Sequence, residues 1–220
     1  DKNAKAEVDD AGFGGVVSAK LLEPMDPAGD YFGLMYDFQG HGTSTAATVA
    51  SKGTEYYDIY SNSTKYRLAG MAPDAQIIPV KALWTGGAIY GWLYAAGFDN
   101  QDGKWRYSGN HRADIISNSW GISNFPLLKS GPGYDILSTF SSALVVPGML
   151  AENYPGTVVV NSAGNNGVGY GSVGTPNTSP LAISVGATTN HVHLAYGPFA
   201  GITRFGPSTA AYDDVSEFSS

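Results

Sequence analysis

The chain has 220 residues, of which 43% are hydrophobic and only 14% are charged, and its formal net charge is −7. A chain of this length suits one globular domain with a sizeable core. An acidic chain with few charges lacks the basic face that nucleic-acid binding requires, so we expect no nucleic-acid partner. It contains no cysteine, which excludes disulfides, thiolate chemistry and cysteine-bound zinc. No run of about eighteen apolar residues occurs, so we expect no membrane span.

The most informative segment is residues 40–51, which read GHGTSTAATVAS. One histidine stands between Gly40 and Gly42 at the predicted start of a helix of small residues. Histidine is the side chain best suited to move a proton near neutral pH. Because glycine has no Cβ, a substrate backbone could approach His41 closely. His41 is therefore a candidate general base, although a structural histidine at a helix start would give the same pattern.

The next stretch, residues 52–70, interrupts this pattern with tyrosines among polar residues, which predicts an exposed loop or a small hairpin. It contains the sequon Asn62-Ser63-Thr64, and a second sequon lies at Asn177-Thr178-Ser179. Both could accept glycans if the chain is secreted.

Four apolar runs are short and continuous rather than alternating, which is typical of strands buried on both faces of a parallel sheet. They span residues 77–83, 114–118, 157–161 and 182–187. Helix-length segments lie between them, at residues 88–96 and 134–153. Pro147 should kink or split the second helix.

This alternation of strand and helix predicts an α/β fold, a doubly wound parallel sheet with helices on both faces. We expect one sheet to contain Val80, Ile116, Val159 and Val185. Polar turns follow two of these strands, at Ser119 and Asn165. Such folds bind ligands at the carboxyl ends of their strands, so we expect these turns and His41 to line one crevice.

Residues 191–214 are rich in glycine, proline and aromatics and predict an excursion between core elements. His191 and His193 lie two residues apart in it. A metal site would need further ligands that the sequence does not identify, so we interpret both as surface histidines, and any metal site remains unknown.

Four motifs stand in the order found in the subtilisin-like serine proteases, the subtilase family. They are G-H-G-T at 40–43, S-x-G at 119–121, A-G-N-x-G at 163–167 and I-x-V-G-A-T at 183–188. Residues 72–83 and 215–220 also resemble this family, so the resemblance runs from residue 37 to residue 220. It implies a secreted or cell-surface serine endopeptidase that cleaves polypeptides with an Asp/His/Ser triad.

The resemblance also implies roles for individual residues. His41 would be the base, and the side-chain amide of Asn165 would donate to the oxyanion. Asn166 is the neighbouring rival, but the aligned motif selects Asn165. Ser119-Trp120-Gly121 would pair with an extended substrate as an added strand, opposite a wall formed by Ser162-Ala163-Gly164. For Trp120, core packing is the alternative.

The remaining triad members are harder to place. Asp10 fits the family's aspartate motif loosely and lies 31 residues before His41, but its preceding residues are too charged for a buried strand and the true aspartate could lie upstream. The family's serine motif follows the F-S-S element, and this chain stops at Ser220. The only Gly-Thr-Ser overlaps the histidine motif, so we interpret Ser44 as a packing residue. We expect residues 1–220 to be an incomplete catalytic domain, inactive alone, whose partner is the rest of that domain.

No cofactor is expected for the chemistry. Calcium is common in this family, but no dense acidic loop appears, so a structural calcium site would use scattered backbone and aspartate oxygens. The rival hypothesis is a non-catalytic relative, a surface or assembly component that keeps the fold without the reaction.

Overall fold

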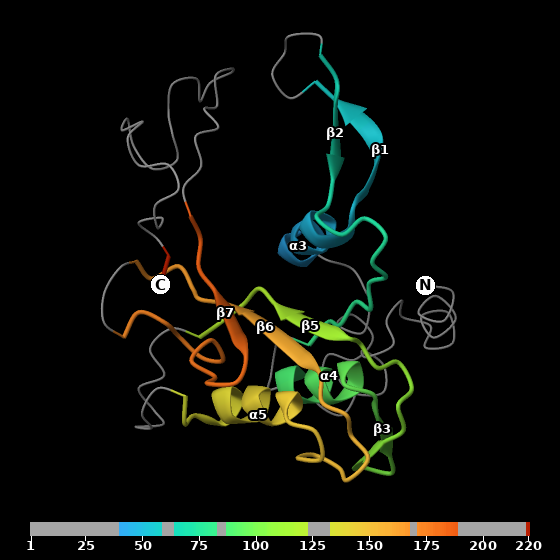
Figure 1. Cartoon of the computed structure of the whole chain (residues 1–220), viewed down its shortest axis with the longest axis vertical. Helices are drawn as coiled ribbons and strands as arrows, with labels where there is room; N and C mark the ends of the chain where they lie inside the picture. Colours follow the sequence, from blue (N-terminus) through green and yellow to red (C-terminus); the bar gives the residue numbers. More distant parts are fainter. Residues whose placement is uncertain (1–39, 59–63, 83–86, 123–132, 168–170, 189–218) are drawn as a thin grey trace, which may run out of the picture.

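The computed structural model describes residues 40–58, 64–82, 87–122, 133–167, 171–188 and 219–220, and Figure 1 shows their arrangement. Asp10, Asn62, His191 and His193 lie outside the described residues. The elements in chain order are α3 (His41–Ala50), β1 (Lys52–Tyr57), β2 (Tyr66–Ala69), α4 (Gly87–Ala95), β3 (Phe98–Gln101), β4 (Lys104–Tyr107), β5 (Ile115–Asn118), α5 (Ile136–Val145), β6 (Val158–Ser162) and β7 (Ile183–Val185).

The central element is a three-stranded sheet in the order β5-β6-β7, and both of its pairings are parallel. Ile116 lies opposite Val159, and Val185 lies opposite Ser162. Three of the four residues that we expected in one parallel sheet are therefore in it. The continuous apolar runs predicted these strands correctly because both faces of each strand carry apolar side chains.

Helices α4 and α5 lie side by side under one face of this sheet (Figure 1). The core lies between them and the sheet, where Ile116 and Val159 meet Trp92 of α4 and Leu144 of α5. On the opposite face Ile115, Val158, Ile183 and Val185 are exposed among the described residues. This packing confirms an α/β fold with a parallel sheet.

Val80 is not in the sheet, so that part of the prediction is wrong. No strand is assigned to residues 77–82 within the described part of the chain. Val80 is half-buried and packs with Ala82 against α4 instead. A short apolar run shows that its side chains are buried, but burial against a helix needs no strand pairing.

Gly91 of α4 allows this close contact. A Cβ at this position would lie 2.7 Å from the Ala82 Cβ and 2.9 Å from the Val80 Cγ1. We expect Gly91→Ala to lower the free energy of unfolding by about 1–3 kcal/mol, because overpacking outweighs the better helix propensity of alanine. Urea denaturation measures the change. Ala88→Gly, at the start of the same helix, measures the difference in helix propensity between alanine and glycine. A Gly91→Ala variant that is more stable than wild type would show that the contact with Val80 and Ala82 is not tight.

Helix α5 is shorter than the predicted segment because it ends at Val145, two residues before Pro147. Val146 is extended, as the residue before a proline tends to be. At the other end, the buried carboxylate of Asp135 caps the helix by accepting hydrogen bonds from the Leu137 and Ser138 amides at 3.0 and 2.9 Å. It also accepts a hydrogen bond from the Thr175 hydroxyl, which ties α5 to the turn after β6.

Because the Asp135 carboxylate caps α5 in its ionised form, we expect the free energy of unfolding to depend on pH. Burial raises the pKa of Asp135, but the hydrogen bonds from Thr175, Ser138 and Leu137 outweigh burial and hold the pKa below its usual 3.8. The ionised form therefore stabilises the fold fully above pH 3.8, and this contribution disappears as the pH falls through the lower folded value.

We expect Asp135→Asn to lower the unfolding free energy at pH 7 by about 1 kcal/mol, because an amide acceptor replaces a charged one. The difference from wild type should shrink as the pH falls below about 3.8. Denaturation curves from pH 7 downward measure this, and a difference that does not change with pH would contradict the assignment.

Two hairpins flank the sheet. Strands β1 and β2 pair antiparallel, which confirms the hairpin predicted for residues 52–70. Strands β3 and β4 also pair antiparallel, around a two-residue turn at Asp102 and Gly103 with φ values of 53° and 78°. Asp-Gly is a strong signal for this turn because both positions require a positive φ.

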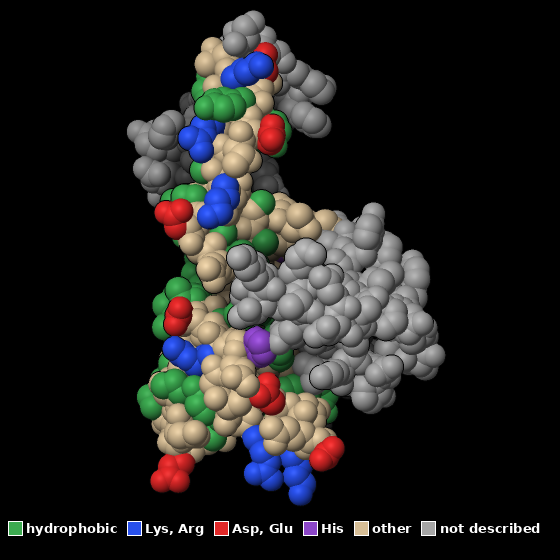
Figure 2. All heavy atoms as spheres, turned by 90° about the vertical axis from the view of Figure 1, so that its right-hand side faces the viewer, with side chains coloured by type: hydrophobic (Ala, Val, Ile, Leu, Met, Phe, Trp, Pro, Cys, Tyr) green, Lys and Arg blue, Asp and Glu red, His purple; other side chains and the backbone are tan. Residues whose placement is uncertain are grey.

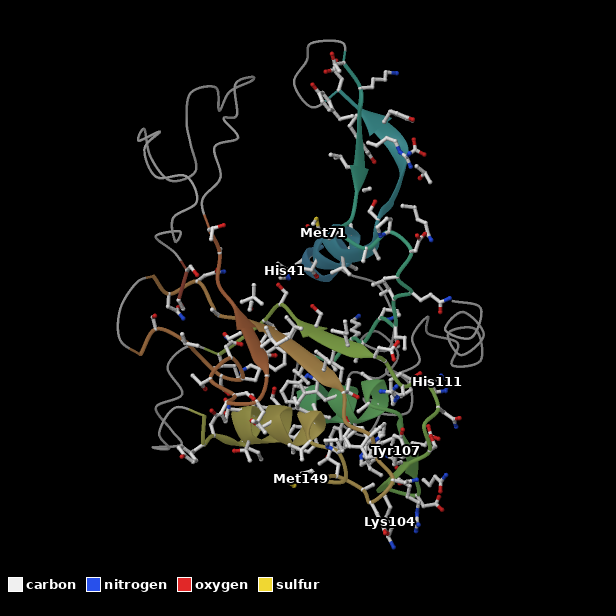
Figure 3. All side chains as sticks on the ribbon, in the orientation of Figure 1. His41, Met71, Lys104, Tyr107, His111 and Met149 are labelled. Atoms are coloured by element: carbon white, nitrogen blue, oxygen red, sulfur yellow. The ribbon has the colours of Figure 1, made fainter. Side chains whose placement is uncertain are left out.

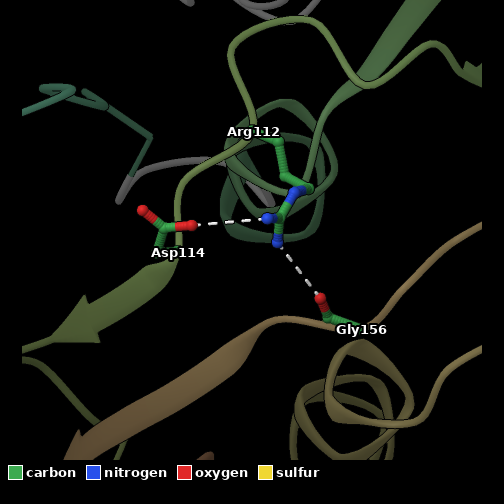
Figure 4. Close-up of polar contacts among 3 residues, drawn as sticks. All are labelled: Arg112, Asp114 and Gly156. Atoms are coloured by element: carbon green, nitrogen blue, oxygen red, sulfur yellow. Dashed lines mark hydrogen bonds and ion pairs between the residues drawn. The ribbon is translucent and has the colours of Figure 1, made fainter.

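A polar contact joins the segments that lead into β5 and β6 (Figure 4). The Arg112 guanidinium lies 3.3 Å from the Asp114 carboxylate and donates a hydrogen bond to the Gly156 carbonyl at 3.4 Å. The Asp114 side chain is 92% exposed, so this ion pair adds little stability. Elsewhere on the face shown in Figure 2, acidic and basic side chains are interspersed. No helix in the described ranges is long and apolar enough to cross a membrane.

Candidate active site

A cleft of about 210 Å³ opens where the carboxyl ends of β5 and β6 meet the first residue of α3. Its lining comes from four separate segments of the chain. The lining residues are His41, Ser119, Trp120, Gly121, Ile122, Ser162, Gly164, Asn165, Asn166, Gly174 and Asn177. Two strand ends and one helix start thus converge on one crevice, as the fold class predicts.

His41 is the first residue of α3, and its side chain is exposed. Gly40 precedes it with φ 79° and ψ −10°, a left-handed conformation that glycine adopts without strain. Residues 70–72 donate backbone hydrogen bonds to the carbonyls that end α3, which fixes the helix in place. Figure 3 shows His41 on the side of the sheet that faces α3, away from His111. Within the described residues, no side chain is recorded as a hydrogen-bond partner of its ring.

Asn165 and Asn166 differ in what their side chains do. The Asn166 amide donates to the Ser172 carbonyl at 3.2 Å, and its backbone N–H donates to the Ser220 hydroxyl at 3.0 Å. Asn166 therefore holds the loop together. For Asn165, no side-chain hydrogen bond is recorded among the described residues, and the residue is exposed at the cleft. An uncommitted amide at a strand end can donate to charge that develops in a bound substrate.

A profile of the subtilase family matches residues 22–220, nine-tenths of the chain. The chain belongs to the subtilase family. It is 33% identical over 194 residues to pyrolysin from Pyrococcus furiosus, covering 79% of this chain and 13% of that protein. It is 31% identical over 185 residues to the minor extracellular protease Vpr of Bacillus subtilis, covering 82% of this chain and 18% of Vpr.

A plant relative shows the same extent of similarity. The subtilisin-like protease SBT1.4 of Arabidopsis thaliana is 32% identical over 181 residues, covering 80% of this chain and 20% of that protein. The chain thus spans a fifth or less of the length of these three relatives.

The expected substrate strand of this subtilase, Ser119-Trp120-Gly121, lies along the cleft. Trp120 also stacks on the buried Trp92 with ring centroids 5.5 Å apart. It continues the face of β5 on which Ile116 and Asn118 are buried, since side chains two apart share a face. Trp120 therefore packs on the core and lines the cleft, which joins the two interpretations that the sequence left open.

The opposite wall needs one correction. Ser162 and Gly164 line the cleft, but Ala163 does not. Ala163 is 5% exposed, its N–H donates to the Val185 carbonyl at 2.8 Å, and its own carbonyl accepts from the Asn177 amide at 3.2 Å. It continues the buried face of Val159 and Asn161, so the period of two that defines a strand turns it away from the cleft.

Asn177, Gly174 and Ile122 are lining residues that sequence reasoning missed. Residues 122 and 175 pair as an antiparallel bridge, which brings the 174–177 turn beside the substrate strand. Asn177 is the first residue of a sequon that could accept a glycan in a secreted chain, but its position in the fold does not suit this role. Its side chain is 4% exposed, and its amide nitrogen is bonded to Ala163 inside the fold. No local sequence signal reveals the contact, because it depends on tertiary packing.

Three further predictions concern Asp10, Ser44 and a metal site, which the described residues of the cleft lining do not include. Asp10 lies outside both the described residues and the matched region of this subtilase. Ser44 lies one turn after His41 on α3 and is exposed, so the described residues do not bury it. Among the described residues, no group of three or more His, Asp or Glu side chains could hold a metal ion, and a structural calcium site stays a prediction.

Proposed function

We propose that the protein is a secreted serine endopeptidase in which His41 is the general base and the Asn165 amide stabilises the oxyanion. The position of these two residues at one cleft, from a helix start and a strand end, supports this role most strongly. The nearby segment 119–121 would bind an extended polypeptide as an added strand, with Ser162 and Gly164 forming the opposite wall.

In this proposal, residues 1–220 supply the base and the oxyanion donor. The nucleophilic serine lies after Ser220, in the remainder of the domain. The serine oxygen attacks the carbonyl carbon of the scissile bond while His41 accepts the serine proton. Negative charge develops on the carbonyl oxygen, where the Asn165 amide donates to it. His41 then gives the proton to the leaving amine as the carbon–nitrogen bond breaks. Asp10 is our candidate for orienting the imidazole, and Asn62 for carrying a glycan.

The alternative is a non-catalytic relative with the same fold. Within residues 1–220, Gly-Thr-Ser occurs at the start of α3, on the same helix as His41. Ser44 is not among the residues that line the cleft, so we do not propose it as the nucleophile.

Hydrolysis of a denatured protein substrate separates the two hypotheses. We expect the protein as it occurs naturally, with whatever sequence flanks these 220 residues, to release peptides from it. Residues 1–220 purified alone should release none, because the proposed nucleophile is elsewhere. Release of peptides by residues 1–220 would overturn the proposed division of the site, and an inactive natural protein would favour the non-catalytic relative.

A further inference from the structure

Two asparagines form a buried amide pair directly beneath the cleft. Asn118 of β5 and Asn161 of β6 lie opposite each other in the parallel register, and they are 5% and 0% exposed. The Asn118 amide donates to the Asn161 side-chain carbonyl at 2.9 Å. The pair therefore links the last residue of β5 to the penultimate residue of β6 on the face that packs against α4 and α5.

Both ends of this pair are bonded further. The Trp92 indole N–H of α4 donates to the Asn118 side-chain carbonyl at 2.9 Å. The Asn161 amide donates to the Pro176 carbonyl at 3.2 Å and to the Ser141 hydroxyl of α5 at 3.3 Å. We call this chain of bonds, from Trp92 through Asn118 and Asn161 to Pro176, the amide ladder.

Three residues of the amide ladder immediately precede residues that line the cleft. Asn118 precedes Ser119, Asn161 precedes Ser162, and Pro176 precedes Asn177. The walls also touch, because a Cβ on Gly121 would lie 2.8 Å from the Asn177 amide nitrogen. A small shift of one strand end against the others would therefore change the width of the cleft.

Core stability alone does not account for these residues. Burying amides costs free energy, and a well-packed apolar pair of similar size is often as stable. What hydrogen bonds add is direction, since each fixes the distance and angle between the groups that it joins. The amide ladder thus sets the relative position of three segments that apolar contacts alone would leave free to slide.

We propose that Asn161 is a positioning residue for substrate binding, which acts through the amide ladder to hold the cleft walls at their working separation. This inference rests on the proposed peptidase function. Asn161 joins most of the parts, because it bonds β5, α5 and the 174–177 turn at once.

The test compares an extended peptide with a small activated ester in the natural protein. The peptide fills the cleft, whereas the ester needs only the catalytic groups. We expect Asn161→Leu to lower kcat/KM for the peptide by about tenfold to a hundredfold, mainly through KM, because small misplacements in a site have effects of this size. Ester hydrolysis should change by less than about threefold, because the ester does not depend on the separation of the cleft walls. Ser142→Ala in α5, which removes the hydroxyl contact between α5 and Ser179, is the control and should change neither.

A second variant separates positioning from folding. Asn118→Leu/Asn161→Leu replaces the amide pair by an apolar pair, so its melting temperature should recover toward that of wild type while the peptide KM stays high. This variant also carries the test if Asn161→Leu does not fold.

Recovery of both melting temperature and KM would overturn the proposal, because the amide ladder would then serve folding alone. An unchanged KM in Asn161→Leu would also overturn it. A natural protein that cleaves neither substrate would instead reject the proposed function, and this inference with it.

Discussion

Replacing His41 by alanine should lower kcat for peptide hydrolysis in the natural protein by about 10⁴-fold or more, because no other described group at the cleft can take the serine proton. The nearest lining side chains are hydroxyls, amides and an indole, which are poor bases near neutral pH. KM should change little, since His41 stands at the helix start and the substrate walls come from other segments. Initial rates with a fluorogenic peptide measure both constants.

His111→Gln is the control for the loss of a histidine. His111 stacks on Tyr94 with ring centroids 5.4 Å apart, and it lies away from His41 (Figure 3). The His111→Gln variant should have an unchanged kcat. If His41→Ala kept wild-type activity, or if His111→Gln lost as much, the assignment of the base would be wrong.

Replacing Asn165 by alanine should lower kcat by about 10²–10³-fold with little change in KM, because a donor aimed at the oxyanion acts mainly in the transition state. Asn166→Ala is the matched comparison. Its amide is committed to the Ser172 carbonyl, so this variant loosens the loop and should lower kcat by less than about tenfold. A larger kcat loss in Asn166→Ala than in Asn165→Ala would exchange the two roles.

The strand ends of this cleft were predictable because chemistry and periodicity agree there. The apolar runs that contain Ile116 and Val159 each end in polar residues, and parallel strands bring such ends to one edge. The same periodicity, applied beyond the ends of the strands, would have turned Ala163 toward the core and predicted the packing of Trp120. The directions of these two side chains could therefore have been predicted from the sequence.

Other features depend on tertiary contacts that a sequence pattern does not encode. Val80 is apolar in a short run, yet it packs on α4 without joining the sheet, because burial and strand pairing are separate requirements. Asn177 reaches the cleft only because the 174–177 turn pairs with residue 122. The partnership of Asn118 with Asn161 likewise depends on the register between β5 and β6. Such contacts appear only once the chain is folded.

Labelling with a serine-directed fluorophosphonate tests the central claim most directly, because the reagent reports a serine that is activated by a base. Mass spectrometry of the labelled natural protein would locate the modified residue. We predict one label per chain, on a serine that follows Ser220, and no label after His41→Ala or on residues 1–220 alone. Labelling of Ser44 or Ser119, or a natural protein that takes up no label, would contradict the account.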